Sequence, residues 1–288
     1  MQLTRAEELE WKPLTALRDS SKDAKHLLIG EEGAPDNYRL VMIREQGGAK
    51  STGPRHKHTF DQLRYVLSGR ANYGPKRFIG AGEVAYFPEG VFYGPEESEG
   101  DRLGLTWQFG GAGGLGLISN RQANDATEAL QQTGKFERGI YYPNDPGSRK
   151  AQDSYEAVWE YVNGRRITYP KPRYDEPILM RTDHFVWQDQ PGQRGVEAKL
   201  LGVFTERRLE IAMLRIAAGS HAMLGPRDGV QTAYVVTGTG TVDEAAIGPQ
   251  TAFEVKAGTA AQVLASTDID LIVVGLPIFV RAKQRTRA

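Results

Sequence analysis

The sequence predicts an all-β dominated protein of two jelly-roll β-barrels joined by a helical connector. Six short runs rich in β-branched and aromatic residues fall within about 70 residues of the first half, and similar runs return after residue 183. Most of the 33 glycines separate such runs, as in tight turns between strands. The stretch between the two series has helical periodicity instead. Two similar β-rich halves indicate a duplicated domain.

The first barrel is expected at residues 38–118, after an N-terminal arm of residues 1–37. We expect the first 30 residues of this arm to be irregular or partly helical. The strands of the barrel are predicted at 38–45, 62–69, 70–74, 76–80, 83–88 and 102–109. A glycine-rich flexible break follows them.

Residues 119–164 are expected to form the helical connector. A first helix is predicted over 119–134, with Ser119 or Asn120 as its N-cap and Gly134 as its end. A second is predicted over 148–164 and ends at Asn163-Gly164. Its apolar stripe consists of Ala151, Tyr155, Val158 and Val162.

The second barrel is expected at residues 165–280, where short β-rich runs recur at regular spacing. Residues 281–288 form a basic tail that we expect to be solvated and disordered. The chain is therefore divided into an arm, two barrels, a connector and a tail.

Charge and composition exclude several classes of function. The 36 basic and 36 acidic residues cancel, which argues against a general nucleic-acid binder. No run approaches 18 apolar residues, and the N-terminus lacks the apolar core of a signal peptide, so we expect no membrane partner. The absence of cysteine excludes disulfides and thiolate sites, and a cytoplasmic location fits best.

The stretch "PRHKHTFDQLRYVLSGRANYG" at residues 54–74 carries the most specific pattern. His56 and His58 are two residues apart, so on an extended segment their side chains point the same way. Gln62 and Gly69 follow at fixed intervals. The stretch "GEVAYFPEGVFY" comes next, where Pro88 and Gly90 predict a turn that returns Tyr93 along the next strand.

These two stretches resemble the two sequence motifs of the cupin superfamily, over about residues 38–110. The histidine pair, Gly69, Gly82, Pro88 and Gly90 match the motifs. Two metal-ligand positions differ, because Gln62 stands at the glutamate position and Tyr93 at the second-motif histidine. Glu97 stands at the terminal asparagine position. The resemblance implies cupin-like barrels.

The resemblance also implies a divalent transition metal held by His56, His58, Gln62 and Tyr93. Two imidazoles suit Fe, Mn, Ni, Zn or Cu, so the identity of the metal stays open. If Gln62 faces the lumen, Arg64 does so too and is suited to hold a substrate carboxylate. Tyr93 could ligate as a phenolate or serve as a neutral acid or base.

The second half keeps the frame of the motif and loses most of its ligands. Gln231 and Gly238 repeat the spacing of Gln62 and Gly69, and the two histidine positions become Gly225 and Arg227. Lys256, Gly258 and Ala261 replace Pro88, Gly90 and Tyr93, and His221 is out of phase and reads as a surface residue. This barrel is expected to be structural or dimerising; the alternative is a pocket lined by Arg227 and Gln231.

The function indicated is a metal-dependent bicupin enzyme for a small anionic or phenolic substrate, with Tyr93 and Arg64 as catalytic residues. The reaction could be dioxygenation or redox-neutral isomerase or lyase chemistry. One alternative is a metal-free cyclase or isomerase in which Tyr93 and a histidine move protons. Another is a small-molecule-binding bicupin without turnover. A homodimer is expected because edge strands of open barrels often pair.

Overall fold

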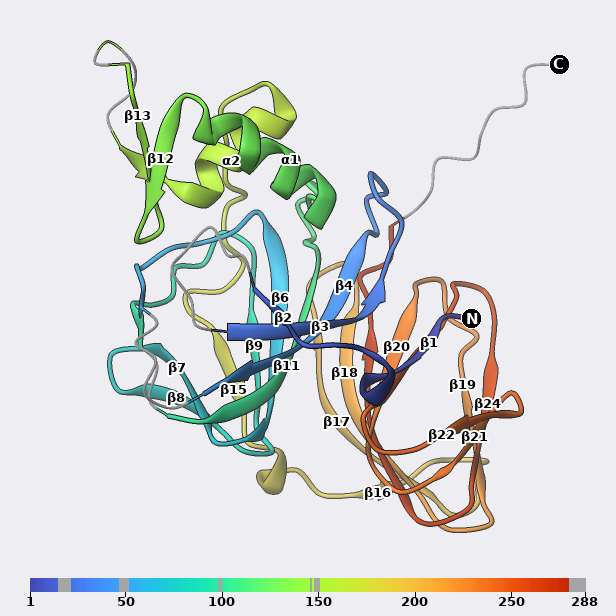
Figure 1. Ribbon diagram of the computed structural model, residues 1–288. Coiled ribbons are helices and arrows are strands. Elements are labelled where there is room, and N and C mark those ends of the chain that lie inside the picture. The colour runs from blue at the N-terminus through green and yellow to red at the C-terminus, as the bar shows by residue number, and fades with distance from the viewer. Residues whose placement is uncertain (15–21, 47–51, 98–99, 146, 148–150, 280–288) are drawn as a thin grey trace, which may run out of the picture. The chain divides into compact units, whose positions relative to one another are not determined.

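The computed structural model describes residues 1–14, 22–46, 52–97, 100–145, 147 and 151–279 (Figure 1). The chain divides into two compact units. One unit is Thr4–Phe185, and the other combines Met1–Leu3 with the chain from Val186 onward. The basic tail predicted at 281–288 lies outside the described residues.

The first unit contains a seven-stranded antiparallel sheet in its described part, with the order β15-β9-β6-β11-β4-β3-β2. Its strands are β2 (Lys12–Pro13), β3 (Lys22–Ile29), β4 (Tyr38–Glu45), β6 (Phe60–Ser68), β9 (Val84–Phe87), β11 (Arg102–Gly110) and β15 (Ile178–Met180). Two separate antiparallel pairs complete the barrel: β5 (Thr52–Gly53) with β10 (Glu96–Glu97), and the hairpin of β7 (Arg70–Gly74) with β8 (Arg77–Gly80). The six predicted strands are confirmed, with shifts of one or two residues at their ends.

Two predictions about the ends of this unit were wrong. Residues 22–29 are not an irregular arm; they form β3, which pairs with β4 because Ala24, Leu27 and Leu28 bury their side chains against the sheet. The unit also extends past residue 164. Residues 178–180 form β15 and pair with β9, so the boundary falls at Val186 rather than at 165.

The first helix begins as the sequence predicts and ends three residues before Gly134, whereas the second begins later than predicted, at Ser154 rather than 148. Helix α1 (Asn120–Gln131) has Ser119 as its N-cap, in a capping box with Gln122. Helix α2 (Ser154–Asn163) begins after Asp153, whose carboxylate accepts from the first backbone N–H groups, and it ends at Gly164 in the left-handed conformation (φ 62°).

A small sheet separates the two helices. Its strands are β12 (Gly134–Glu137), β13 (Ile140–Pro143) and β14 (Gln152–Asp153). Gly134, predicted as the end of the first helix, instead starts β12, because α1 already ends at Gln131. Short 3-10 helices lie at Ala6–Glu8 and Thr182–His184.

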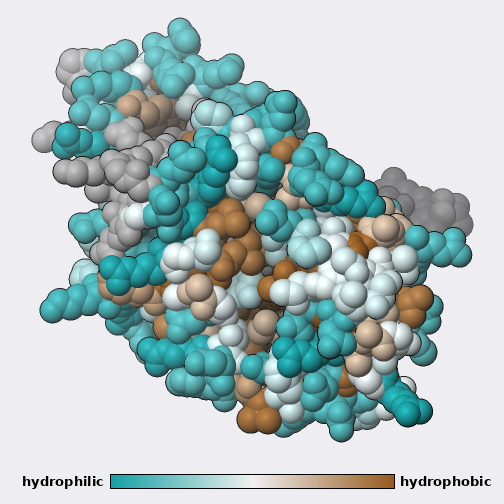
Figure 2. Space-filling view, turned by 60° about the horizontal axis from the view of Figure 1, so that its bottom comes forward, coloured by the Kyte–Doolittle hydropathy of each residue, from teal (hydrophilic) through white to brown (hydrophobic). Residues whose placement is uncertain are grey.

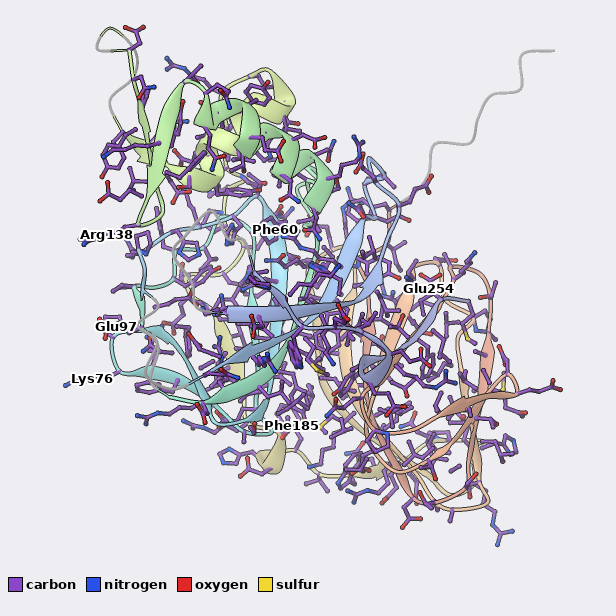
Figure 3. The ribbon with its side chains drawn as sticks, viewed as in Figure 1. Phe60, Lys76, Glu97, Arg138, Phe185 and Glu254 are labelled. Atoms are coloured by element: carbon purple, nitrogen blue, oxygen red, sulfur yellow. The ribbon has the colours of Figure 1, made fainter. Side chains whose placement is uncertain are left out.

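The two helices cover one end of the first barrel (Figure 1). Tyr155 and Trp159 of α2 pack with Phe60 of β6 and with Leu117, and all four are buried. Figure 3 labels Phe60 at the side of the barrel that faces the helices. The helical connector thus forms a wall of the first barrel as well as linking the two barrels in sequence.

The second unit has two sheets in its described part. The larger has the order β1-β23-β20-β25-β18-β17-β16, and the smaller β19-β24-β21-β22. The larger sheet consists of β1 (Leu3–Arg5), β16 (Gln188–Asp189), β17 (Val196–Phe204), β18 (Leu209–Ile216), β20 (Gln231–Thr237), β23 (Thr251–Val255) and β25 (Ile269–Gly275). The smaller consists of β19 (His221–Leu224), β21 (Gly240–Val242), β22 (Ala245–Ile247) and β24 (Ala261–Ala265).

Apolar side chains from both sheets fill the second unit. Ile216 and Val235 of the larger sheet belong to one buried cluster with Leu224 and Val263 of the smaller.

Large apolar side chains that are exposed occur in both units and include Ile29, Phe92, Tyr161, Val186 and Leu200. Figure 2 shows brown apolar patches separated by teal and white residues on one face.

Equivalent glycines confirm that the two halves repeat one frame. Gly69 and Gly238 both follow a central strand and both have positive φ, 74° and 83°. A Cβ atom would lie 2.2 Å from the Asp101 carbonyl oxygen at Gly69 and 2.0 Å from that of Asp268 at Gly238. Only glycine fits this turn without displacing the backbone.

Candidate active site

All five predicted site residues line one pocket of the first unit. The pocket has a volume of about 280 Å³ and is lined by His56, His58, Gln62, Arg64 and Tyr93 among others. Residues of both helices, including Asn120 and Tyr155, close one side of it. The spacing of the two sequence motifs therefore corresponds to five residues that share one pocket.

Backbone pairing brings the two motifs together. His56 and Tyr93 form an antiparallel bridge, in which the His56 amide donates to the Tyr93 carbonyl over 2.9 Å and the reverse bond measures 3.0 Å. The Gly90 amide donates to the His58 carbonyl over 2.8 Å. Gly90 has φ 77°, and a Cβ there would lie 2.5 Å from the Pro170 carbonyl oxygen. The turn thus requires a glycine.

The histidines and Tyr93 form a buried aromatic group. Nδ1 of His56 lies 2.7 Å from the Pro54 carbonyl oxygen, and since a carbonyl only accepts, Nδ1 carries the proton. Nε2 of His58 lies 2.8 Å from the Tyr93 hydroxyl. The three side chains are at most 9% exposed. A proton can therefore move between Tyr93 and His58 without bulk water.

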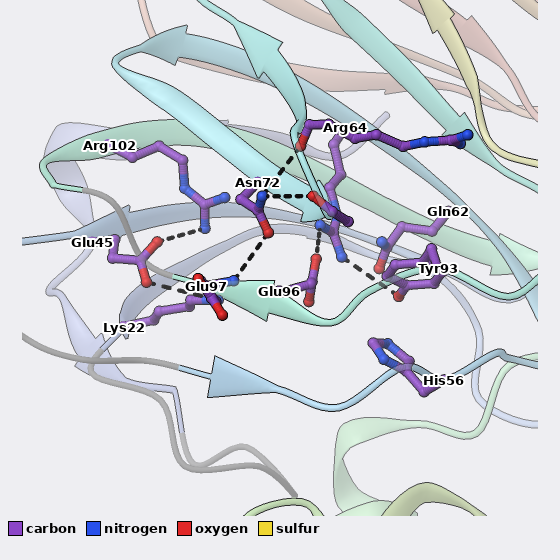
Figure 4. A network of polar contacts seen from close by, with 12 residues as sticks. Lys22, Glu45, His56, Gln62, Arg64, Asn72, Tyr93, Glu96, Glu97 and Arg102 are labelled. Atoms are coloured by element: carbon purple, nitrogen blue, oxygen red, sulfur yellow. Dashed lines mark hydrogen bonds and ion pairs between the residues drawn. The ribbon is translucent and has the colours of Figure 1, made fainter.

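Arg64 contacts the oxygen of Tyr93 and is itself paired with an acid. Its guanidinium donates to Glu96 and, over 3.5 Å, to the Tyr93 hydroxyl (Figure 4). Burial alone would raise the pKa of Glu96, but Arg64 and then Lys22 outweigh it, so this pKa lies well below its usual range. Glu96 is therefore ionised at neutral pH and balances the charge of Arg64.

A second ion-pair group lies beside this one. Glu45 is buried and pairs with Arg102 over 3.0 Å and with Lys22 over 3.9 Å (Figure 4). Burial lowers the pKa of Lys22 and also that of Arg102. Glu97, at the terminal motif position, has an exposed side chain and does not line the pocket in the described part of the chain.

Gln62 lies in a row of side chains that crosses three adjacent strands. In the sheet register Gln108 of β11 faces Gln62 of β6 on one side and Arg39 of β4 on the other. The Gln108 amide contacts Gln62 over 2.8 Å, and Arg39 donates to Gln108. The far amide atom of Gln62 lies 2.7 and 2.9 Å from two nitrogens of Arg64. The Gln62 amide is thus engaged by protein groups.

Sequence reasoning missed Arg39, Gln108 and Glu96. A signal for the first two was present. Arg39, Val41 and Ile43 are spaced two residues apart on one strand, as are Thr106 and Gln108 on another, and all five line the pocket. Period-two alternation marks one face of each strand. Glu96 follows the second motif in a two-residue strand, for which the sequence carried no periodic signal.

The donors present fit a divalent transition metal at three positions. His56, His58 and Tyr93 lie together, with ring centroids 4.2 to 5.8 Å apart, and His56 Nδ1 bonds a carbonyl as metal-bound histidines do. The amide of Gln62, the fourth predicted ligand, contacts Gln108 and Arg64, and its role as a ligand stays a prediction. No group of three His, Cys, Asp or Glu side chains gathers anywhere in the described residues.

In the corresponding region of the second unit, the side chains at the motif positions make different contacts. Arg227 donates to the Leu276 carbonyl over 2.6 Å and to the Arg208 carbonyl, so main-chain oxygens accept from its guanidinium. His221 is exposed on β19, as predicted. The apolar cluster described above occupies the space between the sheets.

Comparison with solved structures decides the fold. The chain is similar to a protein of Nostoc punctiforme described as a "putative dioxygenase", at 13% identity and a TM-score of 0.63 over 98% of this chain and 84% of that one. It is similar to oxalate decarboxylase of Bacillus subtilis at 14% identity and a TM-score of 0.55, over 97% and 77% of the two chains. The protein has a bicupin fold.

Other comparisons set the limits of this result. The chain is also similar to a protein of Pseudomonas aeruginosa described as a "putative glyoxylate induced protein", at 8% identity and a TM-score of 0.63 over 98% of this chain and 91% of that one. No protein-family model matches the sequence, and no curated protein matches it. No helix of the described residues is long and apolar enough to cross a membrane. Likeness at this identity establishes the fold, and function has to be argued from the site.

Proposed function

We propose that the first barrel of this bicupin is an enzyme site that acts on a small organic anion by redox-neutral proton transfer. The observation that carries the proposal is the 2.8 Å contact between His58 Nε2 and the Tyr93 hydroxyl, inside a pocket of about 280 Å³. A phenol bonded to an imidazole is a competent acid–base pair.

The charge of the pocket supports an anionic substrate. Three arginines line it, namely Arg39, Arg64 and Arg102, together with Lys22, whose pKa is lowered by burial. The carboxylates that pair with them are Glu96, which also lines the pocket, and Glu45. Among the described residues, these two carboxylates leave an excess of positive charge, which favours entry and binding of an anion.

Each catalytic side chain has a distinct role in the proposed reaction. Tyr93 gives a proton to a substrate oxygen or takes one from a substrate carbon, and His58 exchanges that proton through Nε2. Arg64, within 3.5 Å of the Tyr93 oxygen, stabilises negative charge that develops there. His56, protonated at Nδ1, keeps Nε2 as an acceptor.

A second candidate is the metal-dependent reaction that the sequence favoured. His56, His58 and Tyr93 are the residues that would hold a divalent transition metal, and such an ion would act as a Lewis acid on a substrate oxygen. Similarity to the protein described as a "putative dioxygenase" favours an oxygen-consuming version, including one with a phenolic substrate.

The remaining expectations stay proposals. We propose a small molecule as the partner of the first barrel and a homodimer as the assembled state. A structural role for the second barrel is supported by its apolar interior and by the engagement of Arg227 with main-chain oxygens. A cytoplasmic location is supported only by the absence of cysteine.

The test is proton exchange in heavy water. Wild-type protein is incubated with a panel of small 2-oxo, hydroxy and phenolic acids, and proton NMR follows the loss of signals beside carbonyl groups. We expect exchange that survives chelation and is lost in Tyr93→Phe. Exchange that needs a metal, and disappears together with bound metal in His56→Ala, supports the second candidate, as does oxygen uptake. Absence of exchange with every acid would sink the lead proposal.

A further inference from the structure

Arg39 differs from the other cations of the pocket in having no carboxylate partner among the described residues. Arg64 pairs with Glu96, and Arg102 pairs with Glu45. The bonds of Arg39 go to the amide oxygens of Gln108 and Asn120, both neutral. The nearby His26 has its pKa lowered, first by burial and then by Arg39, so it adds no charge at neutral pH.

The positive charge of Arg39 persists at neutral pH. Burial lowers the pKa of its guanidinium to about 10, which keeps it protonated. Of its five N–H donors, the described protein groups accept two. The side chain thus brings an unbalanced charge and further donors to the wall of the pocket.

The row from Arg39 to Arg64 contains more donors than acceptors. Both ends are guanidinium groups, and each of the two amides between them, Gln108 and Gln62, has one oxygen and one nitrogen. With the Gln108 nitrogen donating to the Gln62 oxygen over 2.8 Å, the Gln62 nitrogen faces Arg64 at 2.7 and 2.9 Å. If Gln62 is turned, its nitrogen faces that of Gln108 instead.

The conflict remains for every combination of the two amides. Turning Gln108 as well makes its nitrogen face Arg39. Each arrangement therefore sets at least one pair of N–H donors against each other in a half-buried row, which is costly unless an acceptor is supplied. An anionic oxygen is the acceptor that satisfies both the surplus donor and the surplus charge.

We propose that Arg39 binds the carboxylate of the substrate, with Gln108 and Gln62 as neutral donors beside it. The row places Arg39 two strands from Gln62, which corresponds to about 10 Å between their backbones. The substrate is then a carboxylic acid whose carboxylate and reactive carbon are separated, the first at Arg39 and the second at Tyr93. The proposal rests on the proposed function for the place of the reaction, and not for the binding of the carboxylate.

Binding, and not turnover, tests this subsite. Benzoate and succinate are titrated calorimetrically into the full-length protein, together with benzamide and succinamide, which have the same shape and no charge. In wild type we expect at least one acid to bind about tenfold or more tightly than its amide. Arg39→Met should abolish this preference, and Arg39→Lys should keep part of it. Arg44→Met is the control, since Arg44 lies on the same strand and pairs with Asp23.

The outcomes separate this proposal from the previous one. Preference for the acid that is lost in Arg39→Met but kept in Tyr93→Phe supports the subsite, even if no proton exchange is found. Preference that survives in folded Arg39→Met, or no preference for either acid in wild type, overturns it. Gln108→Leu gives a second measure if Arg39→Met fails to fold, because removing this neutral donor should weaken benzoate binding several-fold; unchanged binding would contradict the proposal.

Discussion

Tyr93 hydrogen-bonds His58 through its hydroxyl and His56 through its backbone, so one residue of the second motif contacts both histidines of the first. The backbone bridge does not depend on the side chain, so the side chain can be changed without separating the motifs. Tyr93→Phe should therefore retain the fold and the ring contacts and lose the proton that His58 exchanges.

We expect Tyr93→Phe to lower the rate of proton exchange at least about 100-fold, the usual contribution of a positioned acid or base. Its free energy of unfolding should fall by about 1–2 kcal/mol, since the bonds of the hydroxyl to His58 and Arg64 are lost. Proton NMR measures the rate of exchange, and urea unfolding measures the free energy of unfolding. Full activity in Tyr93→Phe would remove Tyr93 from the reaction.

Glu96→Gln should destabilise the protein and strengthen anion binding. Arg64 and Glu96 are only 15% and 17% exposed, so removing the carboxylate leaves a largely buried cation without its acid. We expect a loss of about 3 kcal/mol, the lower end for breaking a buried pair, and part of it should be regained when benzoate is added. Thermal denaturation with and without benzoate measures this. Equal stabilisation of wild type and variant by benzoate would contradict the prediction.

Much of this site could be predicted from sequence because its residues obey local rules. The histidine pair on an extended segment and the turn glycine Gly90 require particular residue types at fixed spacing. Arg39 could not be assigned in the same way. Its importance comes from having no carboxylate partner in the described part of the chain, and that depends on how β4, β6 and β11 lie side by side. Tertiary pairing, not local propensity, decides which charges are balanced.

The errors at the ends of the first unit have the same origin. The segment "KDAKHLLI" was expected within an irregular or partly helical arm, yet it forms a strand because β4 supplies its hydrogen bonds. Likewise residues 178–180 are ordered by β9, which lies more than 90 positions earlier in the chain. Strand propensity is weak evidence where pairing with another strand decides whether a segment is ordered.

Gly90→Ala and Gly82→Ala form a matched pair of substitutions. Both glycines have positive φ, 77° and 81°, so alanine is strained at each by about 1 kcal/mol. At Gly82 no atom lies within 4 Å of the added Cβ, whereas at Gly90 the Pro170 oxygen lies at 2.5 Å. We expect Gly90→Ala to lose about 1–3 kcal/mol more than Gly82→Ala, measured by urea unfolding. Equal losses of unfolding free energy would show that the backbone at Pro170 moves away from the added Cβ without a measurable energetic cost.

Asp61, next to Gln62 in sequence, accepts hydrogen bonds from the Tyr86 hydroxyl at 3.0 Å and the Glu89 amide at 2.8 Å, on a fully buried carboxyl. Burial raises its pKa to about 7, and the charge of Glu89 adds to this while Arg173, which bonds Glu89 over 2.8 Å, opposes it. The native state therefore holds a proton that the unfolded state releases near pH 4.

From this difference we expect stability to fall as the pH rises from about 4 to about 7, by at most about 1.4 kcal/mol per pH unit, and to level off above that. Asp61→Asn cannot ionise and should lack this component of the slope. Urea unfolding at pH 5, 6, 7 and 8 gives the free energies, and the quantity to compare is wild type minus Asp61→Asn. Asp23→Asn, at a half-exposed surface pair with Arg44, is the control and should not remove the slope. A wild-type curve parallel to that of Asp61→Asn would mean that Asp61 is already ionised at pH 5.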